Sequence, residues 1–424
     1  MFIDALKNIF KSRDLRKKII IVLALLVVFR IAAAIPVPGI DTARLKSFVE
    51  GNQFFGLLNI FSGGGLSTFS IVMLGVAPYI TASIIMQLLT LIFPSIKEIY
   101  QEAGEAGQKK FNQYARLLTV PLGVIQSYSF LTLLSRQGVI NNLTRFAFFQ
   151  DVIIITAGTL FLMWLGEIMT EQKIGNGVSL LIFAGIIAGL PAQIRQLALN
   201  YDPTKIPVYL TFLIVAIIVI GGVVLLTEGQ RNVPVQYAKR VRGMRVYGGV
   251  STYLPLRVNQ GGVIPIIFAI SVLLFPGMIG TILGQTKIYW LSKFAYSLQT
   301  LLNNQLIYGV LYFVLIVLFT YFYTAVTFDY KNIAENIQKQ GGFIPGLRPG
   351  LPTQEFLGFT LNRITLVGAV SLGLVAILPL TITAATKTQG LALGGTSLLI
   401  VVAVVLDIVK QIKAQLAMRE YETS

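Results

Sequence analysis

This sequence contains no cysteine and no histidine. The first absence excludes disulfide bonds and thiol chemistry, and the second excludes imidazole acid–base catalysis and histidine-ligated metal sites. There is also no Gly-Lys-Ser or Gly-Lys-Thr, so the chain has no P-loop with which to hydrolyse ATP. We therefore expect a protein that is not an enzyme and that holds neither a cofactor nor a metal ion.

Charged residues are scarce as well. They make up 12% of the 424 residues, whereas about 25% is usual in soluble domains. Hydrophobic residues make up 55%, and the mean hydropathy is +0.75, which indicates a polytopic membrane protein. The hydrophobic pattern predicts ten membrane spans, near residues 19–35, 70–92, 117–134, 152–169, 177–190, 208–226, 263–283, 306–328, 364–380 and 396–412.

The placement of the charges predicts the orientation. Most of the Lys and Arg residues behind the net charge of +16 fall in segments that are cytoplasmic if the N-terminus lies inside. Basic residues concentrate on the cytoplasmic side of membrane proteins, so both termini are predicted to be cytoplasmic. Arg30 lies within the first span near its outer end, and we expect it to snorkel toward the membrane surface.

Acidic residues are nearly absent from the predicted spans and lie at or near their ends: Asp151, Glu167, Glu228, Asp329 and Asp407. Ion-coupled carriers typically need carboxylates inside the membrane as relays or ligands. The sequence therefore favours a passive conduit, which an apolar constriction can seal against ions by dewetting. A secondary transporter for a small solute is the alternative, since inverted repeats and broken helices are also compatible with it.

The stretch 54–92 has enough apolar residues to cross a bilayer, but Gly63–Gly65, Gly75 and Pro78 interrupt it. Non-helical backbone at membrane depth is tolerated only where protein or a water-filled cavity surrounds it. One interpretation is a glycine-rich loop followed by a single spanning helix. The interpretation we favour is a short half-inserted helix followed, from Ser70 onward, by a span that lines a cavity.

The chain divides into two parts of five spans each, 1–195 and 196–424, at an outer connector that contains three prolines. An odd number of spans gives the two parts opposite orientations, so related parts would form an inverted repeat. The fifth span begins GVSLLI (177–182) and the tenth contains GTSLLI (395–400). This similarity gives the repeat weak support.

Two connectors expected on the cytoplasmic side are long, residues 228–262 and 329–363. The first carries six basic residues and one acid, and the second contains the run FIPGLRPG (343–350). Loops of this length usually have a function or are disordered. A basic loop with glycines and aromatics suits an anionic partner such as ribosomal RNA or an acidic protein surface, although basic residues that serve topology alone would show the same pattern.

Several of these segments together resemble the SecY protein-translocation channels. The resemblance runs nearly end to end and is carried by Ile35–Asp41, Ser70–Leu89, Trp164–Gly177, Gln236–Arg240, Phe343–Gly350 and Gly394–Val402. One departure is Lys173, where family members commonly have glycine. The resemblance implies an all-α membrane protein with ten transmembrane helices, in two pseudo-symmetric inverted halves around an hourglass pore. It also implies a channel that passes unfolded secretory polypeptides across the membrane and releases transmembrane segments sideways into lipid.

The resemblance further implies roles for individual residues. A ring of aliphatic side chains would close the waist of the pore: Val76, Ile80, Val178, Ile182, Ile267 and Ile400. A plug at about 54–69 would close the outer funnel, with Phe54, Leu57, Leu58, Ile60, Phe61, Gly63, Gly64 and Gly65. The second and seventh spans would form a lateral gate, with Thr81, Ile84, Ile85, Gln87, Ile270, Ser271 and Phe275.

Partners are implied in the same way. Arg240 and Arg348, on the two long loops, would contact the SecA motor ATPase or the ribosome. The family also implies SecE-type and SecG-type small membrane subunits, and nascent secretory and membrane-protein chains as substrates. The expected location is the inner or plasma membrane of the cell, surrounded by its lipid bilayer.

Overall fold

The structure is a computed structural model that describes residues 12–38, 45, 59, 62–101, 104–136, 138, 144–199, 203, 206–237, 240–242, 245–247, 251–283, 289–386 and 389–423. Five of the expected plug residues lie outside this described part of the chain: Phe54, Leu57, Leu58, Ile60 and Phe61. The side chains of Arg240 and Phe275 lie outside it as well.

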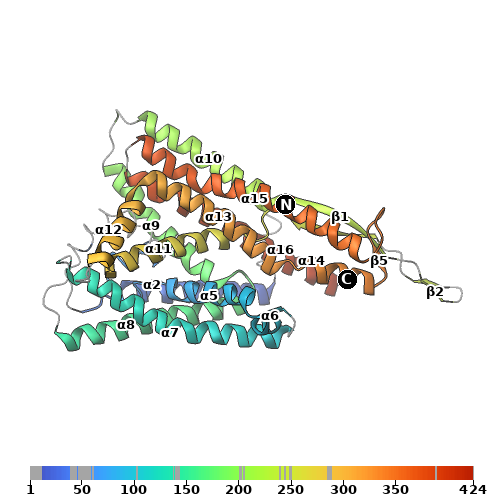
Figure 1. The fold of residues 1–424 in the computed structure, drawn as a ribbon, viewed down its shortest axis with the longest axis horizontal. Coiled ribbons are helices and arrows are strands. Elements are labelled where there is room, and N and C mark those ends of the chain that lie inside the picture. Colours follow the sequence, from blue (N-terminus) through green and yellow to red (C-terminus); the bar gives the residue numbers. More distant parts are fainter. Residues whose placement is uncertain are drawn as a thin grey trace.

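Long helices dominate the described chain (Figure 1). They are α2 (Arg13–Ala34), α5 (Ala77–Ile92), α6 (Pro94–Gln101), α7 (Gly104–Arg136), α8 (Arg145–Glu171), α9 (Gly177–Leu199), α10 (Ile206–Glu228), α11 (Ile264–Leu283), α12 (Tyr289–Asn303), α13 (Gln305–Thr327), α14 (Tyr330–Lys339), α15 (Leu351–Thr386) and α16 (Gln389–Thr423).

Polar side chains begin several of these helices. The Thr144 hydroxyl accepts a hydrogen bond from the backbone N–H of Ala147 at the start of α8, and the Asn304 side chain accepts from Leu306 and Ile307 at the start of α13. Such caps satisfy backbone donors that have no partner within the helix. They fix where the helix begins after a connector.

A helix lies at each of the ten predicted span positions, but not all of these helices are long and apolar enough to cross a membrane. Among the described residues five helices meet that test, and a sixth does if α5 and α6 count together as one broken span, bent by 117°. The chain is therefore a mostly helical, multi-pass membrane protein. The number of crossings stays a prediction.

The segment before α5 differs from the sequence prediction. Residues 62–69 and 71–76 form consecutive turns, and Ser70 forms an isolated bridge with Pro36, so the second span begins as a helix at Ala77 and not at Ser70. Gly75 adopts a left-handed φ of 58°, which interrupts a helix, and proline is favoured in the first helical turn that follows. Within the predicted half-inserted helix, about 54–68, the described residues are Asn59, which is helical, and 62–68, which are turn.

The helices form two connected groups. One contains α2, α5, α7, α8 and α9, and the other contains α10, α11, α13, α15 and α16. Between the groups, α11 packs against α5 and α7, while α16 packs against α9. One large buried apolar cluster extends through both groups.

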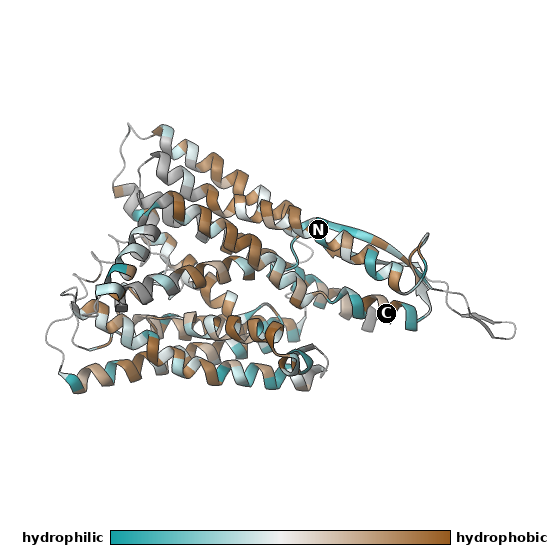
Figure 2. Cartoon of the chain, viewed as in Figure 1, coloured by the Kyte–Doolittle hydropathy of each residue, from teal (hydrophilic) through white to brown (hydrophobic). Residues whose placement is uncertain are grey.

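The expectation of an all-α protein is wrong in one region. The long connectors fold together: β1 (Gln230–Tyr237) pairs with both β4 (Ser251–Arg257) and β5 (Gly342–Phe343) in an antiparallel sheet of order β4-β1-β5. A second hairpin, β2 (Arg240–Arg242) with β3 (Arg245–Tyr247), extends beyond it (Figure 1). Hydrophilic residues gather at this end of the molecule, whereas hydrophobic residues cover the bundle (Figure 2).

Candidate pore, gate and docking surfaces

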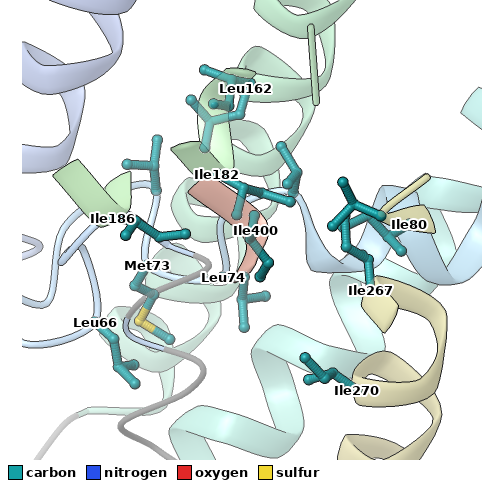
Figure 3. Close-up of a cluster of buried hydrophobic side chains, with 14 of the residues drawn as sticks. Leu66, Met73, Leu74, Ile80, Leu162, Ile182, Ile186, Ile267, Ile270 and Ile400 are labelled. Carbon is teal, nitrogen blue, oxygen red and sulfur yellow. The ribbon is translucent and has the colours of Figure 1, made fainter. Parts of the chain in front are cut away.

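The six expected ring residues come from four helices and the residue that precedes one of them. Val76 and Ile80 lie at the start of α5, Val178 and Ile182 at the start of α9, Ile267 in α11 and Ile400 in α16. The structure places all six in or against the same buried cluster, with Val178 only half-buried. Figure 3 shows Ile182 beside Ile400 and Ile80 beside Ile267.

These contacts occur where the two helix groups meet. Ile182 and Ile400 belong to the α9–α16 contact, and Ile80 and Ile267 belong to the α5–α11 contact. Leu66, Met73 and Leu74, from the turn segment 62–76, join the same cluster (Figure 3). An apolar cluster built from branched side chains of separate helices can stay dry and can reshape when the helices separate.

The turn segment 62–76 is held mainly by backbone hydrogen bonds to the end of α2 and the residues that follow it. The N–H of Val37 donates to the Phe69 carbonyl at 2.8 Å, and the N–H of Ile71 donates to the Ile35 carbonyl at 3.0 Å. Gly63 and Gly64 have left-handed φ values of 68° and 84°, which L-residues adopt only at a cost, whereas Gly65 does not. The expected hinge glycines therefore include two positions that need glycine for their backbone.

The expected gate residues come from α5 and α11, two helices that pack against each other. Ile84 and Ile270 are almost fully buried, at 3% and 1% exposure, while Ile85 and Gln87 are half-buried. The hydroxyl of Thr81 donates a hydrogen bond to the carbonyl oxygen of Ala77 in its own helix.

In α11, the hydroxyl of Ser271 donates a hydrogen bond to the carbonyl oxygen of Ile267. Both hydroxyl protons are thus used within their own helices and do not join α5 to α11. The side-chain oxygen of Gln87 is buried and has no hydrogen-bond partner among the described residues. An unpartnered buried polar atom destabilises the packing around it, and this one belongs to α5, one of the two helices of the expected gate.

The two long connectors form one small packed unit, which the sequence did not predict. Apolar residues of β1, β4, α14, the turn after β5 and the start of α15 share a buried cluster: Val233, Val235, Leu256, Ala334, Ile337, Ile344 and Leu357. Arg348 lies on the exposed turn between β5 and α15, where its carbonyl accepts a hydrogen bond from the Thr353 hydroxyl at 2.9 Å. Arg240 begins β2 on the projecting hairpin, opposite Tyr247.

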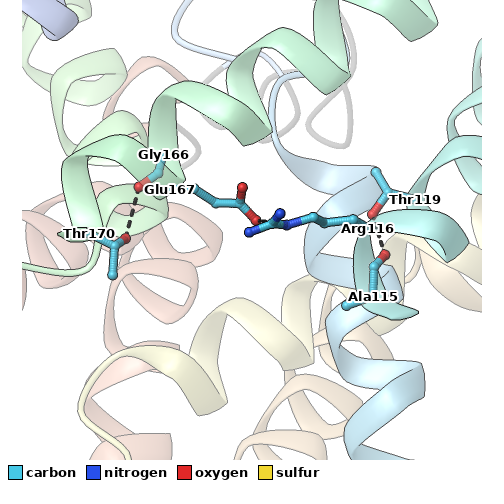
Figure 4. Close-up of polar contacts among 6 residues, drawn as sticks. All are labelled: Ala115, Arg116, Thr119, Gly166, Glu167 and Thr170. Atoms are coloured by element: carbon cyan, nitrogen blue, oxygen red, sulfur yellow. Dashed lines mark hydrogen bonds and ion pairs between the residues drawn. The ribbon is translucent and has the colours of Figure 1, made fainter. Parts of the chain in front are cut away.

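An ion pair joins α7 to α8 at the ends of two predicted spans. Arg116 Nε lies 2.5 Å from Glu167 Oε1, and the two side chains are 46% and 20% exposed (Figure 4). We had noted Glu167 only as an acid at a span end. Opposite charges at adjacent ends of consecutive antiparallel spans are the sequence signal that could have indicated this pair.

The turn between α8 and α9 is closely packed. The Thr170 hydroxyl donates to the Gly166 carbonyl (Figure 4) and accepts from the N–H of Gly177. A Cβ atom on Gly177 would lie 1.8 Å from the Gly166 carbonyl oxygen, so only glycine permits this approach. Lys173 adopts a φ of 57°, a conformation that glycine takes far more easily, so the glycine that the resemblance led us to expect here would suit this backbone better.

No group of three or more acidic residues that could hold a metal ion occurs in the described part of the chain. A site that binds a small ligand needs several polar groups that converge on it. Here the cluster is apolar and the two gate hydroxyls bond within their own helices, so the arrangement suits the passage of a flexible chain better.

The chain is similar to known proteins both in sequence and in fold. The model of the SecY family matches residues 70–409. The chain is 44% identical to the protein translocase subunit SecY of Thermotoga maritima, over 99% of this chain and 97% of that protein, and 42% identical to the Mycobacterium bovis subunit of the same name, over 99% and 98%.

Solved structures share the fold at lower identity. One, described as showing that the plug domain of SecY stabilises the closed translocation channel and maintains a membrane seal, has a TM-score of 0.63 and 22% identity, over 92% of this chain and 90% of that one. Another is Sec61 in the canine ribosome-channel complex, with a TM-score of 0.61 and 20% identity, over 93% and 91%.

Proposed function

The chain belongs to the SecY family and is a protein-conducting channel subunit of a translocase, and from this we propose how its residues conduct, seal and release a polypeptide. The family membership decides against the solute transporter. Unfolded secretory chains cross the membrane through the channel, and transmembrane segments leave it sideways into lipid. The chain performs no catalysis and uses no cofactor, and a partner supplies the energy for movement.

The pore runs through the buried cluster at the ring residues Val76, Ile80, Val178, Ile182, Ile267 and Ile400. The supporting observation is that branched aliphatic side chains of α5, α9, α11 and α16 meet in one cluster, although these elements lie far apart in the sequence. When the two helix groups separate, these side chains form a flexible apolar collar around an extended chain. When the groups close, the collar excludes water and ions.

The plug is the stretch 54–69, and two of its described residues, Leu66 and Phe69, belong to the same buried cluster as the ring. The lateral gate is the α5–α11 seam, with Thr81, Ile84, Ile85, Gln87, Ile270, Ser271 and Phe275. This seam is supported by buried isoleucines and not by hydrogen bonds of its two hydroxyls. A hydrophobic segment in the pore can therefore replace one apolar contact with another as the helices part.

The packed unit of β4-β1-β5, α14 and the start of α15 is the docking surface for the motor or the ribosome. It presents Arg348 on an exposed turn, and the β2–β3 hairpin presents Arg240. Sec61 is a channel found in complex with a ribosome, which supports ribosome binding for this fold. The remaining proposed partners are the SecA ATPase and small SecE-type and SecG-type membrane subunits.

We further propose ten spans in two inverted halves, 1–195 and 196–424, with both termini in the cytoplasm of a cell whose inner or plasma membrane holds the channel. Support comes from the positive-inside bias and from the two connected helix groups, which meet at the α5–α11 and α9–α16 contacts. The start of α2 and the end of α16 line one hollow, so both terminal helices reach the same side of the molecule.

Cross-linking a translocating chain tests the pore directly. Single cysteines replace Ile80, Ile182, Ile267 or Ile400, and each reports alone because the native chain has no cysteine. With a secretory chain stalled part-way, all four positions should cross-link to the same stretch of substrate. Leu225 in α10, which is 75% exposed, is the matched control and should not. Cross-linking from none of the four, or equally from Leu225, would place the pore elsewhere.

A further inference from the structure

Arg30 in α2 contacts the turn segment 62–76, whose first residues belong to the proposed plug. Its Nη1 donates a hydrogen bond of 2.6 Å to the carbonyl oxygen of Gly63, thirty-three positions further along the chain. The expected snorkelling of this arginine toward the membrane surface stays a prediction. In the structure the side chain is exposed, and it satisfies a backbone carbonyl of the proposed plug.

Phe29, the residue before Arg30, packs against the same glycine. Phe29 is 1% exposed, and a Cβ atom added to Gly63 would lie 2.4 Å from the Phe29 ring and 3.2 Å from the backbone of Gly185 in α9. Gly63 is therefore held between two helices, with its carbonyl bound by Arg30. Its left-handed φ of 68° allows the chain to turn at this point.

The rest of the segment is fixed differently. Thr68, Phe69 and Ile71 are hydrogen-bonded to residues at and just beyond the end of α2, and none of these bonds uses a charged side chain. The hydrogen bonds of this group therefore begin at Thr68, near the end of the proposed plug. Arg30 binds earlier in the plug, at Gly63, the first of two adjacent glycines with positive φ.

We propose that Arg30 is a positioning residue that latches the plug in its closed place by holding the Gly63 carbonyl. This inference rests on the proposed plug at 54–69. A guanidinium suits the role because its charge makes the hydrogen bond strong yet leaves it reversible, since the cation can be solvated by water in an open funnel. A fully apolar side chain could pack at this position but could not bind the carbonyl.

The test is the ion leak of resting channels. Purified channels with their membrane partners are placed in vesicles, and potassium release is measured without substrate or motor. Arg30→Gln should raise the leak on the order of tenfold, which corresponds to losing one hydrogen bond to a charged group. Arg30→Lys, which keeps a charged donor, should restore most of the seal.

Two further variants make the test specific. Arg195→Gln removes the same charge from the outer end of α9 and should leave the leak unchanged. Gly63→Ala keeps Arg30 but forces a Cβ atom against Phe29, so this variant should also leak. If Arg30→Gln does not fold, Gly63→Ala alone decides the result. Folded Arg30→Gln and Gly63→Ala channels that seal like wild type would overturn the latch.

Translocation measured on the same vesicles separates this inference from the proposed function. Wild-type and Arg30→Gln channels should both export a secretory chain when the motor is present. A wild type that exports nothing would contradict the proposed function, whereas normal export with an unchanged leak in the folded variants would contradict only the latch.

Discussion

Replacing Gly158 by alanine should open the seal and destabilise the protein, although alanine is the better helix former. Gly158 lies in α8 directly against the turn segment 62–76. A Cβ atom there would lie 1.9 Å from the Ile71 carbonyl oxygen and 2.7 Å from its carbonyl carbon. Ordinary contact begins at 3.4 Å, so the segment has to move by about 1.5 Å away from α8.

The magnitude follows from what that displacement breaks. Two backbone hydrogen bonds hold the segment: Val37 N–H to the Phe69 carbonyl at 2.8 Å, and Ile71 N–H to the Ile35 carbonyl at 3.0 Å. Neither hydrogen bond survives such a shift. At about 0.5–1.5 kcal/mol each, their loss costs roughly 1–3 kcal/mol of unfolding free energy. Alanine regains about 0.5–1 kcal/mol in a helix, which offsets only part of this cost.

Gly221 in α10 is the matched control, because a Cβ atom there meets nothing within 4 Å. Gly221→Ala should be neutral or more stable by up to about 1 kcal/mol. Denaturant unfolding in detergent, followed by intrinsic fluorescence, compares both variants with wild type, and ion release from vesicles measures the seal. A Gly158→Ala protein as stable and as tight as Gly221→Ala would refute the close approach of α8 to this segment.

Three other substitutions test separate parts of the molecule. Arg348→Glu should abolish motor-driven export while the thermal unfolding of the channel stays unchanged, because the side chain is exposed; normal export would remove Arg348 from the docking surface. Arg116→Glu should lower stability by about 1 kcal/mol or less, and the added change Glu167→Arg should restore it, as measured in a double-mutant cycle; additive effects would mean that the pair does not interact. Lys173→Gly should stabilise the protein by about 0.5–1 kcal/mol in denaturant unfolding, whereas Lys173→Ala, which keeps a Cβ atom in the left-handed conformation, should not.

The sequence predicted the positions of the long helices because the bilayer imposes a strong rule on composition. Apolar runs flanked by charged connectors are visible without any knowledge of packing. The predicted start of the second span, Ser70, was wrong for a related reason. Residues 70–76 are as apolar as the helix that follows, and hydrophobicity alone does not distinguish buried turns from buried helix. The left-handed Gly75 and the proline at the helix start were the local signals of a boundary.

The cytoplasmic unit was missed because its contacts are distant in sequence. Gln236 and Tyr237 pair with Phe343 and Gly342, more than a hundred residues away, and the strand β5 that contains these partners has only two residues. Local patterns show basic loops with glycines and aromatics, which is the composition of a surface. They do not show that β1 and α14 each contribute one apolar face to a shared core.

The turn segment 62–76 combines properties that a closed but reversible seal requires. It is held by contacts on three sides: backbone bonds at the end of α2, the bare backbone of α8 at Gly158, and the ring and guanidinium of Phe29 and Arg30 at Gly63. Each contact is short-range and none is covalent, so each can be lost without unfolding the helices that provide it. Glycine at Gly63 and Gly158 permits contacts this close, and the same glycines leave no side chain to hold the segment once it moves. If this segment is the seal that we propose, a helix shift that breaks one set of contacts weakens the seal without unfolding the bundle.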